Sequence, residues 1–163
     1  MRLVRCAGVV LLLLGLLAGS SFAAGDTAPV QKEVKDWLDA YAKAYEKKDI
    51  NSIMAMVSPD SSTVFVDNGP QGRHVGEEAI KAAYQAEFKQ IKSAVLEYTW
   101  LSAASKGDIA WFATELTAKV DLGKQKIEVP GRWTGVLEKR GGKWLMVLSH
   151  FSYTASDDEK DEK

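Results

Sequence analysis

The chain has 163 residues, which is room for one domain of ordinary size. Apolar residues make up 46% and charged residues 26%, which excludes a disordered chain, a collagen and a coiled-coil rod. The formal net charge of −1 offers no basic excess for binding a nucleic-acid backbone. The single cysteine excludes an internal disulfide and a multi-thiolate zinc site.

Residues 1–23 have the features of a signal peptide. Two arginines precede the apolar run Val9–Leu17, and Ser21-Phe22-Ala23 supplies a small-x-small cleavage pattern. The run is shorter than the roughly 20 residues that a membrane-spanning helix needs. We therefore expect cleavage after Ala23 and an exported protein, periplasmic or secreted, with no membrane span and no thiol. A retained N-terminal anchor is the alternative.

The first half of the mature chain is predicted to be mainly helical. After a flexible lead-in at 24–31, apolar residues recur at helical spacing over 34–45, and a short helix is expected over 50–57. The β-branched run at 63–66 predicts a short strand. A third helix is expected over 76–91, with acidic residues in its first turn.

From residue 95 onward the apolar pattern changes to that of strands. Four strands are expected, at 95–103, 109–122, 127–139 and 144–153. Gly141-Gly142 marks a tight hairpin between the last two. Helices followed by an antiparallel meander predict an α+β domain over 32–155, with a cone-like curved antiparallel sheet packed against three N-terminal helices. The charged residues 156–163 are expected to form a flexible tail.

Several stretches of the chain have the order and spacing of a known family. A tyrosine-bearing amphipathic helix is followed by K-K-D-I-x-S-I, a short strand ending in Asp, and G-x-E-A-I opening a helix. The chain closes with R-W-T-G-V-L-E-K-R-G-G-K-W-L-M-V-L-S-H-F-S. Over about residues 31–153 this resembles the SnoaL-like branch of the nuclear transport factor 2 superfamily, which includes ketosteroid isomerase-like proteins. The resemblance implies a cone with a pocket between helices and sheet, and a homodimer formed through the outer face of the sheet.

The resemblance also implies three catalytic positions. Asp67 stands where the family has a carboxylate base, provided that two residues are inserted near residues 58–61. Tyr41, eight residues before Asp49, stands where the family has a hydrogen-bond donor on a helix. Thr134 falls at the position of a neutral carboxylic acid and cannot supply its proton, which argues against steroid isomerisation. Core packing of Tyr41 and turn capping by Asp67 are the alternatives.

The last two strands carry further candidate residues. Arg132 and Thr134 share one face, so Arg132 is a buried cation seeking an anion if that face is inward, and a surface or dimer-face charge if it is outward. His150 is a second candidate hydrogen-bond donor, or else a structural histidine. By strand alternation it is expected to share a face with Ser152 and with Leu148 and Met146.

The strand at 109–122 carries two more candidate site residues. Trp111 could line an apolar pocket, or belong to the core or a dimer interface. Glu115 lies in mid-strand and could be a pocket carboxylate or a surface charge. His74 is expected in an exposed Gly-Arg-His loop, far from His150, so no metal site is expected.

Three functions fit this sequence. The first is a cofactor-independent module that binds a small, largely apolar ligand in the cone, with Tyr41, Arg132 and His150 orienting it and Thr134, Ser152, Trp111 and Glu115 near it. The second is an enzyme of the isomerase, cyclase or lyase kind, with Asp67 as base and Tyr41 or His150 as donor. The third is a non-catalytic dimeric assembly module. The first is preferred. A collapsed pocket favours the third function, a carboxylate inside an open pocket favours the second, and an open pocket without a carboxylate favours the first.

Overall fold

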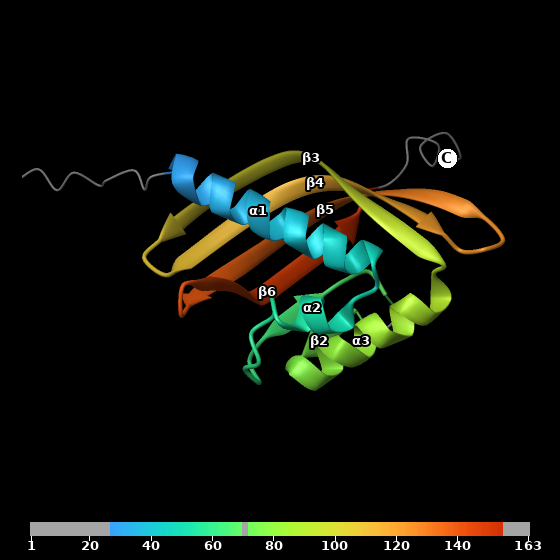
Figure 1. The fold of residues 1–163 in the computed structure, drawn as a ribbon, viewed down its shortest axis with the longest axis horizontal. Coiled ribbons are helices and arrows are strands. Elements are labelled where there is room, and N and C mark those ends of the chain that lie inside the picture. Colours follow the sequence, from blue (N-terminus) through green and yellow to red (C-terminus); the bar gives the residue numbers. More distant parts are fainter. Residues whose placement is uncertain (1–26, 70–71, 155–163) are drawn as a thin grey trace, which may run out of the picture.

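A computed structural model describes residues 27–69 and 72–154 of the chain (Figure 1). The expected signal peptide and its cleavage site, and the charged tail at 156–163, lie outside the described residues. Among the helices described, none is both long enough and apolar enough to span a bilayer.

The helices and strands follow the predicted order, with one strand added. The helices are α1 (Thr27–Glu46), α2 (Ile50–Met54) and α3 (Glu77–Gln90). The strands are β1 (Val64–Val66), β2 (Arg73–Val75), β3 (Ser93–Lys106), β4 (Ile109–Asp121), β5 (Lys126–Arg140) and β6 (Lys143–Tyr153). The α+β class, with helices on a curved sheet, is therefore confirmed.

Helix α1 begins seven residues before the predicted start at Val34. It includes part of the 24–31 segment that was expected to be a flexible lead-in. Pro29 is compatible with this early start because the amide groups of a first helical turn have no partner in the helix. At the other end, Lys48 adopts a left-handed conformation with φ of 54°, and Asp49 then caps α2 by accepting from the Ser52 amide at 3.0 Å.

The sheet has six strands in the order β2-β1-β6-β5-β4-β3. Strands β3 to β6 form the predicted antiparallel meander, but β1 pairs with β6 in parallel, so the sheet is mixed. Strand β2, expected to be an exposed loop, pairs with β1 and places His74 opposite Phe65. Three residues are too few to give a periodic signal, which explains why this strand was missed.

A bulge in β6 reverses the expected side-chain orientation of Met146. Val136 of β5 pairs with Leu148, but the next residue, Leu137, pairs with Met146, so Val147 is an extra residue on β6. Met146 is completely buried whereas Leu148 is exposed. The prediction that these two side chains share a face is therefore wrong, because alternation holds only where no residue is inserted.

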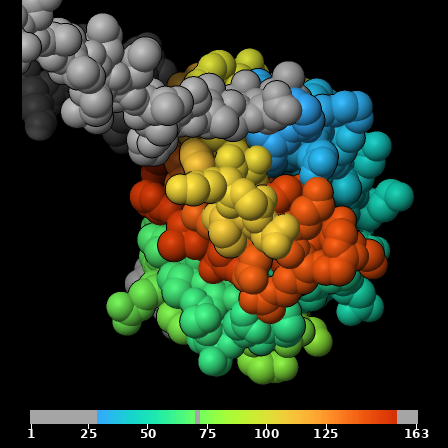
Figure 2. Space-filling view, turned by 90° about the vertical axis from the view of Figure 1, so that its left-hand side faces the viewer, coloured from blue at the N-terminus to red at the C-terminus, as the bar shows by residue number. Residues whose placement is uncertain are grey.

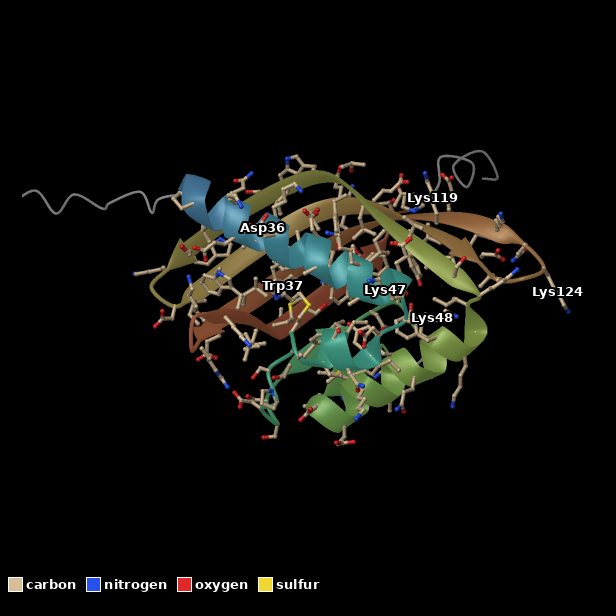
Figure 3. The ribbon with its side chains drawn as sticks, in the orientation of Figure 1. Asp36, Trp37, Lys47, Lys48, Lys119 and Lys124 are labelled. Carbon is tan, nitrogen blue, oxygen red and sulfur yellow. The ribbon has the colours of Figure 1, made fainter. Side chains whose placement is uncertain are left out.

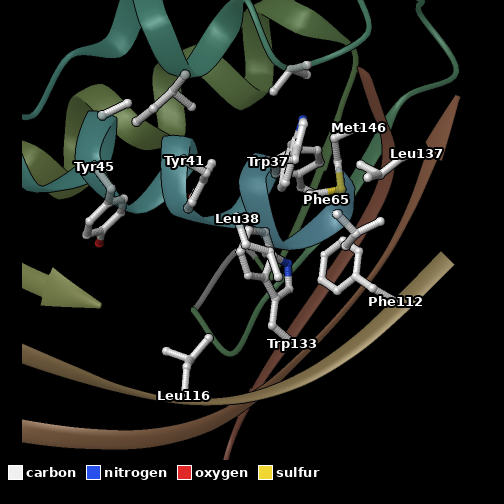
Figure 4. Packing of buried hydrophobic residues seen from close by; sticks show 14 of the residues in the cluster. Trp37, Leu38, Tyr41, Tyr45, Phe65, Phe112, Leu116, Trp133, Leu137 and Met146 are labelled. Atoms are coloured by element: carbon white, nitrogen blue, oxygen red, sulfur yellow. The ribbon is translucent and has the colours of Figure 1, made fainter. Parts of the chain in front are cut away.

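Aromatic rings fill the space between α1 and the sheet (Figure 4). The Trp133 ring lies 4.8 Å from that of Tyr41 and 5.3 Å from that of Phe112, measured between centroids. Trp37 points from α1 toward the sheet, while the adjacent Asp36 lies on the solvent side (Figure 3). On β5, Gly135 allows this packing, since a Cβ there would lie 2.6 Å from the Phe112 ring.

The indole nitrogens inside the cone have partners. Trp133 Nε1 donates to Ser149 Oγ at 2.8 Å, and Trp37 Nε1 donates to the Trp144 carbonyl at 3.1 Å. The deep part of the cone is thus an apolar core whose polar atoms are satisfied.

Ion pairs and hairpin contacts close the end of the cone where α1 begins. Glu33 of α1 accepts from Lys139 Nζ at 2.9 Å and from Trp144 Nε1 at 2.6 Å. The Lys139 amide also donates to the Asp108 carbonyl at 2.7 Å, which joins the two hairpins. Figure 2 shows this end, with the β3–β4 turn in yellow beside the β5–β6 turn in orange.

Candidate functional site

Polar side chains gather at the opposite end, where α1 ends and faces α3. They come from two helices and from the ends of β1 and β6, and we call them the polar end of the cone: Tyr41, Tyr45, Asp67, Tyr84, Glu87 and Tyr153. Tyr41 Oη lies 2.8 Å from Tyr84 Oη, and the Tyr45 hydroxyl donates to Glu87 Oε1. Burial raises the pKa values of Tyr84 and Tyr153, and the charges of Glu87 and Asp67 raise them further.

The Tyr41–Tyr84 pair is a buried hydrogen-bond donor. Each residue is only 7% exposed. Burial raises the pKa of both hydroxyls above the usual value, so both keep their protons at neutral pH. One hydroxyl satisfies the other, which leaves one O–H available to a third group. Such a pair is suited to donating a hydrogen bond to an oxygen atom that gains negative charge.

The second carboxyl group of the polar end is that of Glu87. Glu87 is exposed as a residue, and its Oε1 accepts a hydrogen bond from the partly buried Tyr45 hydroxyl. Burial of the carboxyl group raises its pKa, and the charge of Asp67 raises it further, whereas the hydrogen bond from Tyr45 acts in the opposite direction. Carboxyl groups with a raised pKa beside a second carboxylate are frequent at sites of proton transfer.

Asp67 follows β1 and is held from two sides. Its Oδ1 accepts from the Gly69 amide at 2.7 Å, and its Oδ2 lies 3.2 Å from His74 Nε2. The His74 side chain is 17% exposed, so the expectation that it is an exposed loop residue is wrong. The neighbouring Asn68 accepts from the Tyr153 amide at 3.0 Å, which fixes the end of β6 beside this turn. Asp67 therefore caps a turn and also belongs to the polar end.

The other predicted site residues lie on the opposite face of the sheet. They share the face that points away from the helices, here called the outer face: Trp111, Glu115, Arg132, Thr134, His150 and Ser152. On β5 the outward positions alternate with the buried residues Gly131, Trp133 and Gly135. The structure thus brings these six residues together, but it separates them from Tyr41 and Asp67 by the thickness of the sheet.

The Arg132 side chain points outward from the sheet and is exposed, so Arg132 is not a buried cation. Its Nε lies 3.8 Å from Glu115 Oε1, and the two side chains are 67% and 55% exposed. An ion pair this open contributes little to stability.

Two hollows stand out on the surface formed by the described residues. A groove of about 480 Å³ runs between α1 and β3, with Leu38, Tyr98 and Leu101 among its lining residues. A hollow of about 390 Å³ on the outer face has Trp111 and Leu148 in its lining. Neither hollow includes a residue of the polar end. Within residues 27–69 and 72–154 no group of three or more His, Cys, Asp or Glu residues could hold a metal ion.

The SnoaL-like domain family matches residues 34–156, most of the chain. The chain belongs to this family. No curated protein matches it.

Solved structures of the same fold come from several bacteria. An NTF2-like protein of unknown function from Pseudomonas putida has a TM-score of 0.69 and 18% identity, with 83% of this chain and 94% of that chain covered. A candidate dehydratase of the NTF2-like family from Streptomyces avermitilis has a TM-score of 0.71 and 15% identity over 79% of this chain and 99% of that one. A candidate scytalone dehydratase from Novosphingobium aromaticivorans has a TM-score of 0.70 and 11% identity, covering 78% and 86%. At these identities the likeness establishes the fold alone.

The sequence analysis missed Glu87, although a signal for it exists. Ile80, Tyr84 and Phe88 are the buried stripe of α3, and the exposed Glu87, three residues after Tyr84, lies beside this stripe. A charged residue that borders the apolar face of an amphipathic helix is within reach of the polar groups at the edge of the core.

The pKa of Glu87 gives a direct test of the polar end. In the folded protein we expect this pKa to lie above the value for an exposed glutamate, to fall in Asp67→Asn and to rise in Tyr45→Phe, since these changes remove a like charge and a hydrogen bond to the carboxylate. Carbon-detected NMR titration of the side-chain carboxyl measures it. Because the folded state keeps this proton to higher pH than the unfolded state, the free energy of unfolding should fall as pH rises through that window.

Glu87→Gln should abolish this part of the pH dependence, and Glu78→Gln in the same helix serves as the control. A Glu87 that titrates at or below the ordinary value, or does not respond to Asp67→Asn, would refute the electrostatic coupling.

Proposed function

We propose that this protein binds a small, largely apolar organic molecule at the polar end of the cone and exchanges a proton with it. In this proposal Asp67 is the base, and the Tyr41–Tyr84 pair donates a hydrogen bond to the oxygen of the molecule. One observation supports the proposal: the Tyr41 hydroxyl bonds that of Tyr84, whose pKa is raised by burial and further by the charges of Glu87 and Asp67.

The packing of the cone decides where such a molecule would bind. Trp37, Trp133 and Phe112 fill the deep part of the cone, so the proposal places the molecule beyond these rings, against the residues of the polar end. Apolar surface from Phe65 and Phe151 lies near this region, on the inward faces of β1 and β6. An apolar molecule with one polar oxygen matches these surroundings.

The enzyme alternative gains support from the same cluster. A base and a preorganised donor pair are the parts needed to remove a proton next to a carbonyl group and stabilise the enolate that forms. The similar structures include two candidate dehydratases, which are lyases, and a protein of unknown function. We therefore favour a cofactor-independent lyase or isomerase over a module that only binds its ligand.

Binding of a phenol tests the proposal, because a phenolate oxygen resembles that of an enolate. We expect naphthol to bind the wild-type protein and to bind Tyr41→Phe about tenfold more weakly or worse, since this variant loses a hydrogen bond worth roughly 1.5–3 kcal/mol. Asp67→Asn should bind naphthol at least as tightly as the wild type, because it removes a carboxylate that repels the phenolate oxygen. Isothermal titration calorimetry measures the affinity.

His150→Ala and Arg132→Ala are the matched controls, since both residues lie on the outer face and should leave the affinity unchanged. Weaker binding in these controls, with normal binding in Tyr41→Phe, would move the site to the outer face and contradict the proposal.

We also propose that the outer face joins two copies of the chain in a homodimer. Trp100 and Trp111 are 51% and 47% exposed there, and Leu148 is 43% exposed beside them. Contiguous exposed aromatic surface of this kind is typical of an interface between proteins. Export is part of the same proposal, supported by the signal-peptide features of residues 1–23.

Native mass spectrometry of the protein recovered from the exporting cell tests both points. We expect a dimer of chains that begin at Ala24, and a monomer for Trp111→Ser, because this change removes apolar area from the centre of the face. Ile127→Ser removes an exposed apolar side chain elsewhere and should leave the dimer intact. A wild-type monomer, or a chain that still begins at Met1, would contradict the respective proposal.

A further inference from the structure

The groove between α1 and β3 is separate from the polar end of the cone. Its volume is about 480 Å³, and its floor is formed by apolar and aromatic side chains of the two elements: Leu38, Ala42, Leu96, Tyr98 and Leu101. The Tyr98 hydroxyl donates to the Leu38 carbonyl at 3.4 Å, which ties the helix to the strand across this floor. The groove is therefore built into the fold.

Strand β3, which forms one wall of the groove, is the last strand of the sheet. It pairs with β4 on one side, and no described strand pairs with its other edge. Figure 1 shows β3 as the outermost strand, with α1 crossing in front of it. An edge strand leaves backbone amides and carbonyls without a partner in the sheet, and these groups can pair with another extended chain. The groove thus combines an apolar floor with unpaired backbone groups.

One backbone carbonyl of β3 accepts a hydrogen bond from an amide outside the sheet. Gln31 Nε2, from α1, donates to the Leu101 carbonyl at 3.1 Å, and a side-chain amide is the same kind of donor as a backbone amide. Nearby, Thr99 is an extra residue between Tyr98 and Trp100, and this bulge interrupts regular pairing. The part of the edge that is open to an added strand therefore ends at Tyr98.

The charges beside the groove alternate in sign along α1. They are those of Lys35, Asp39, Lys43 and Glu46, and the first two form an ion pair of 2.7 Å. Because two cations balance two anions, the groove does not favour the head group of an anionic amphiphile such as a fatty acid. An uncharged peptide main chain suits these surroundings better, since an edge strand recognises it through hydrogen bonds.

The length of the groove sets the size of such a peptide. From Lys35 to Glu46 the helix rises by about 17 Å, at 1.5 Å per residue. An extended chain rises about 3.4 Å per residue, so about five residues span this length.

We propose that this groove binds an extended segment of another protein, about five residues long, which adds a strand to the free edge of β3. Alternate side chains of the segment face the floor and are apolar, and the pairing residues exclude proline, which has no amide hydrogen. This inference goes beyond the proposed function and does not rest on it, because no residue of the polar end lines the groove. A homodimer through the outer face leaves the groove accessible, since α1 lies on the other side of the sheet.

Selection from a library of random nonapeptides displayed on phage tests the groove with the wild-type protein. Ala42→Met is the test variant, because the longer side chain fills the groove while methionine remains a good helix former. Ala40→Met is the matched control, since Ala40 is exposed on the same helix and does not line the groove. Fluorescence anisotropy measures the affinity of each enriched peptide for the three proteins.

We expect the enriched peptides to carry apolar residues at alternate positions. They should bind the wild type and Ala40→Met equally and Ala42→Met at least about tenfold more weakly, because their side chains lose the space that they fill.

N-methylation of the peptide backbone distinguishes strand addition from recognition of side chains alone. In an added strand, alternate amides face β3 and the others face solvent. Methylation of the first set should abolish binding, whereas methylation of the second set should change the affinity by no more than about twofold. This measurement uses the wild-type protein and does not depend on how a variant folds.

Several results would overturn the proposal. A selection without binders, or peptides that bind Ala42→Met as tightly as the wild type, would show that the groove is not a peptide site. Peptides that tolerate both sets of N-methyl groups, or neither, would not be added strands. Decanoate that binds the wild type but not Ala42→Met, with no peptide that does so, would make the occupant an amphiphile. Self-association of the wild type that Ala42→Met abolishes would make it a second copy of the chain.

Discussion

The packing of Trp133 against α1 determines where chemistry can occur in this protein. Its ring meets those of Tyr41, Trp37 and Phe112 between α1 and the sheet, and its indole nitrogen is satisfied by Ser149. A cone filled in this way has no space for a ligand in its deep part, because protein interiors are packed as densely as crystals. Polar groups lie beyond these rings, at the two ends of the cone. The polar end of the cone follows from this constraint.

Long periodic segments made most of the fold predictable. The apolar spacing of α1 and the alternation along β3 to β6 depend on neighbours in the chain, so the sequence displays them directly. The parallel pairing of β1 with β6 joins residues about 80 positions apart, such as Val64 and Leu148, and leaves no local signal. No local signal marks β2 either, nor the extra residue Val147 that turns Met146 inward. These features arise only when the sheet assembles.

The resemblance to the SnoaL-like family, and not local periodicity, pointed to Tyr41 and Asp67 as candidates. Alternation correctly grouped Arg132 with Thr134 on β5 and His150 with Ser152 on β6, but alternation does not say which face is inward. Composition normally decides that question, yet here the outer face carries Trp100, Trp111 and Leu148 and is itself apolar. Glu87 was overlooked because acidic residues on helices are usually solvated, although its position three residues after the buried Tyr84 places it beside the apolar stripe of α3.

The central claim is that the ligand binds at the polar end and not on the outer face. The chain has five tyrosines and five tryptophans, so fluorine NMR of protein labelled with fluorotyrosine and fluorotryptophan gives few resonances to assign. On addition of naphthol, the account predicts shifts of Tyr41, Tyr45 and Tyr84, with Trp100 and Trp111 unmoved. Shifts confined to Trp100 and Trp111 would contradict it and would make the outer face the binding surface.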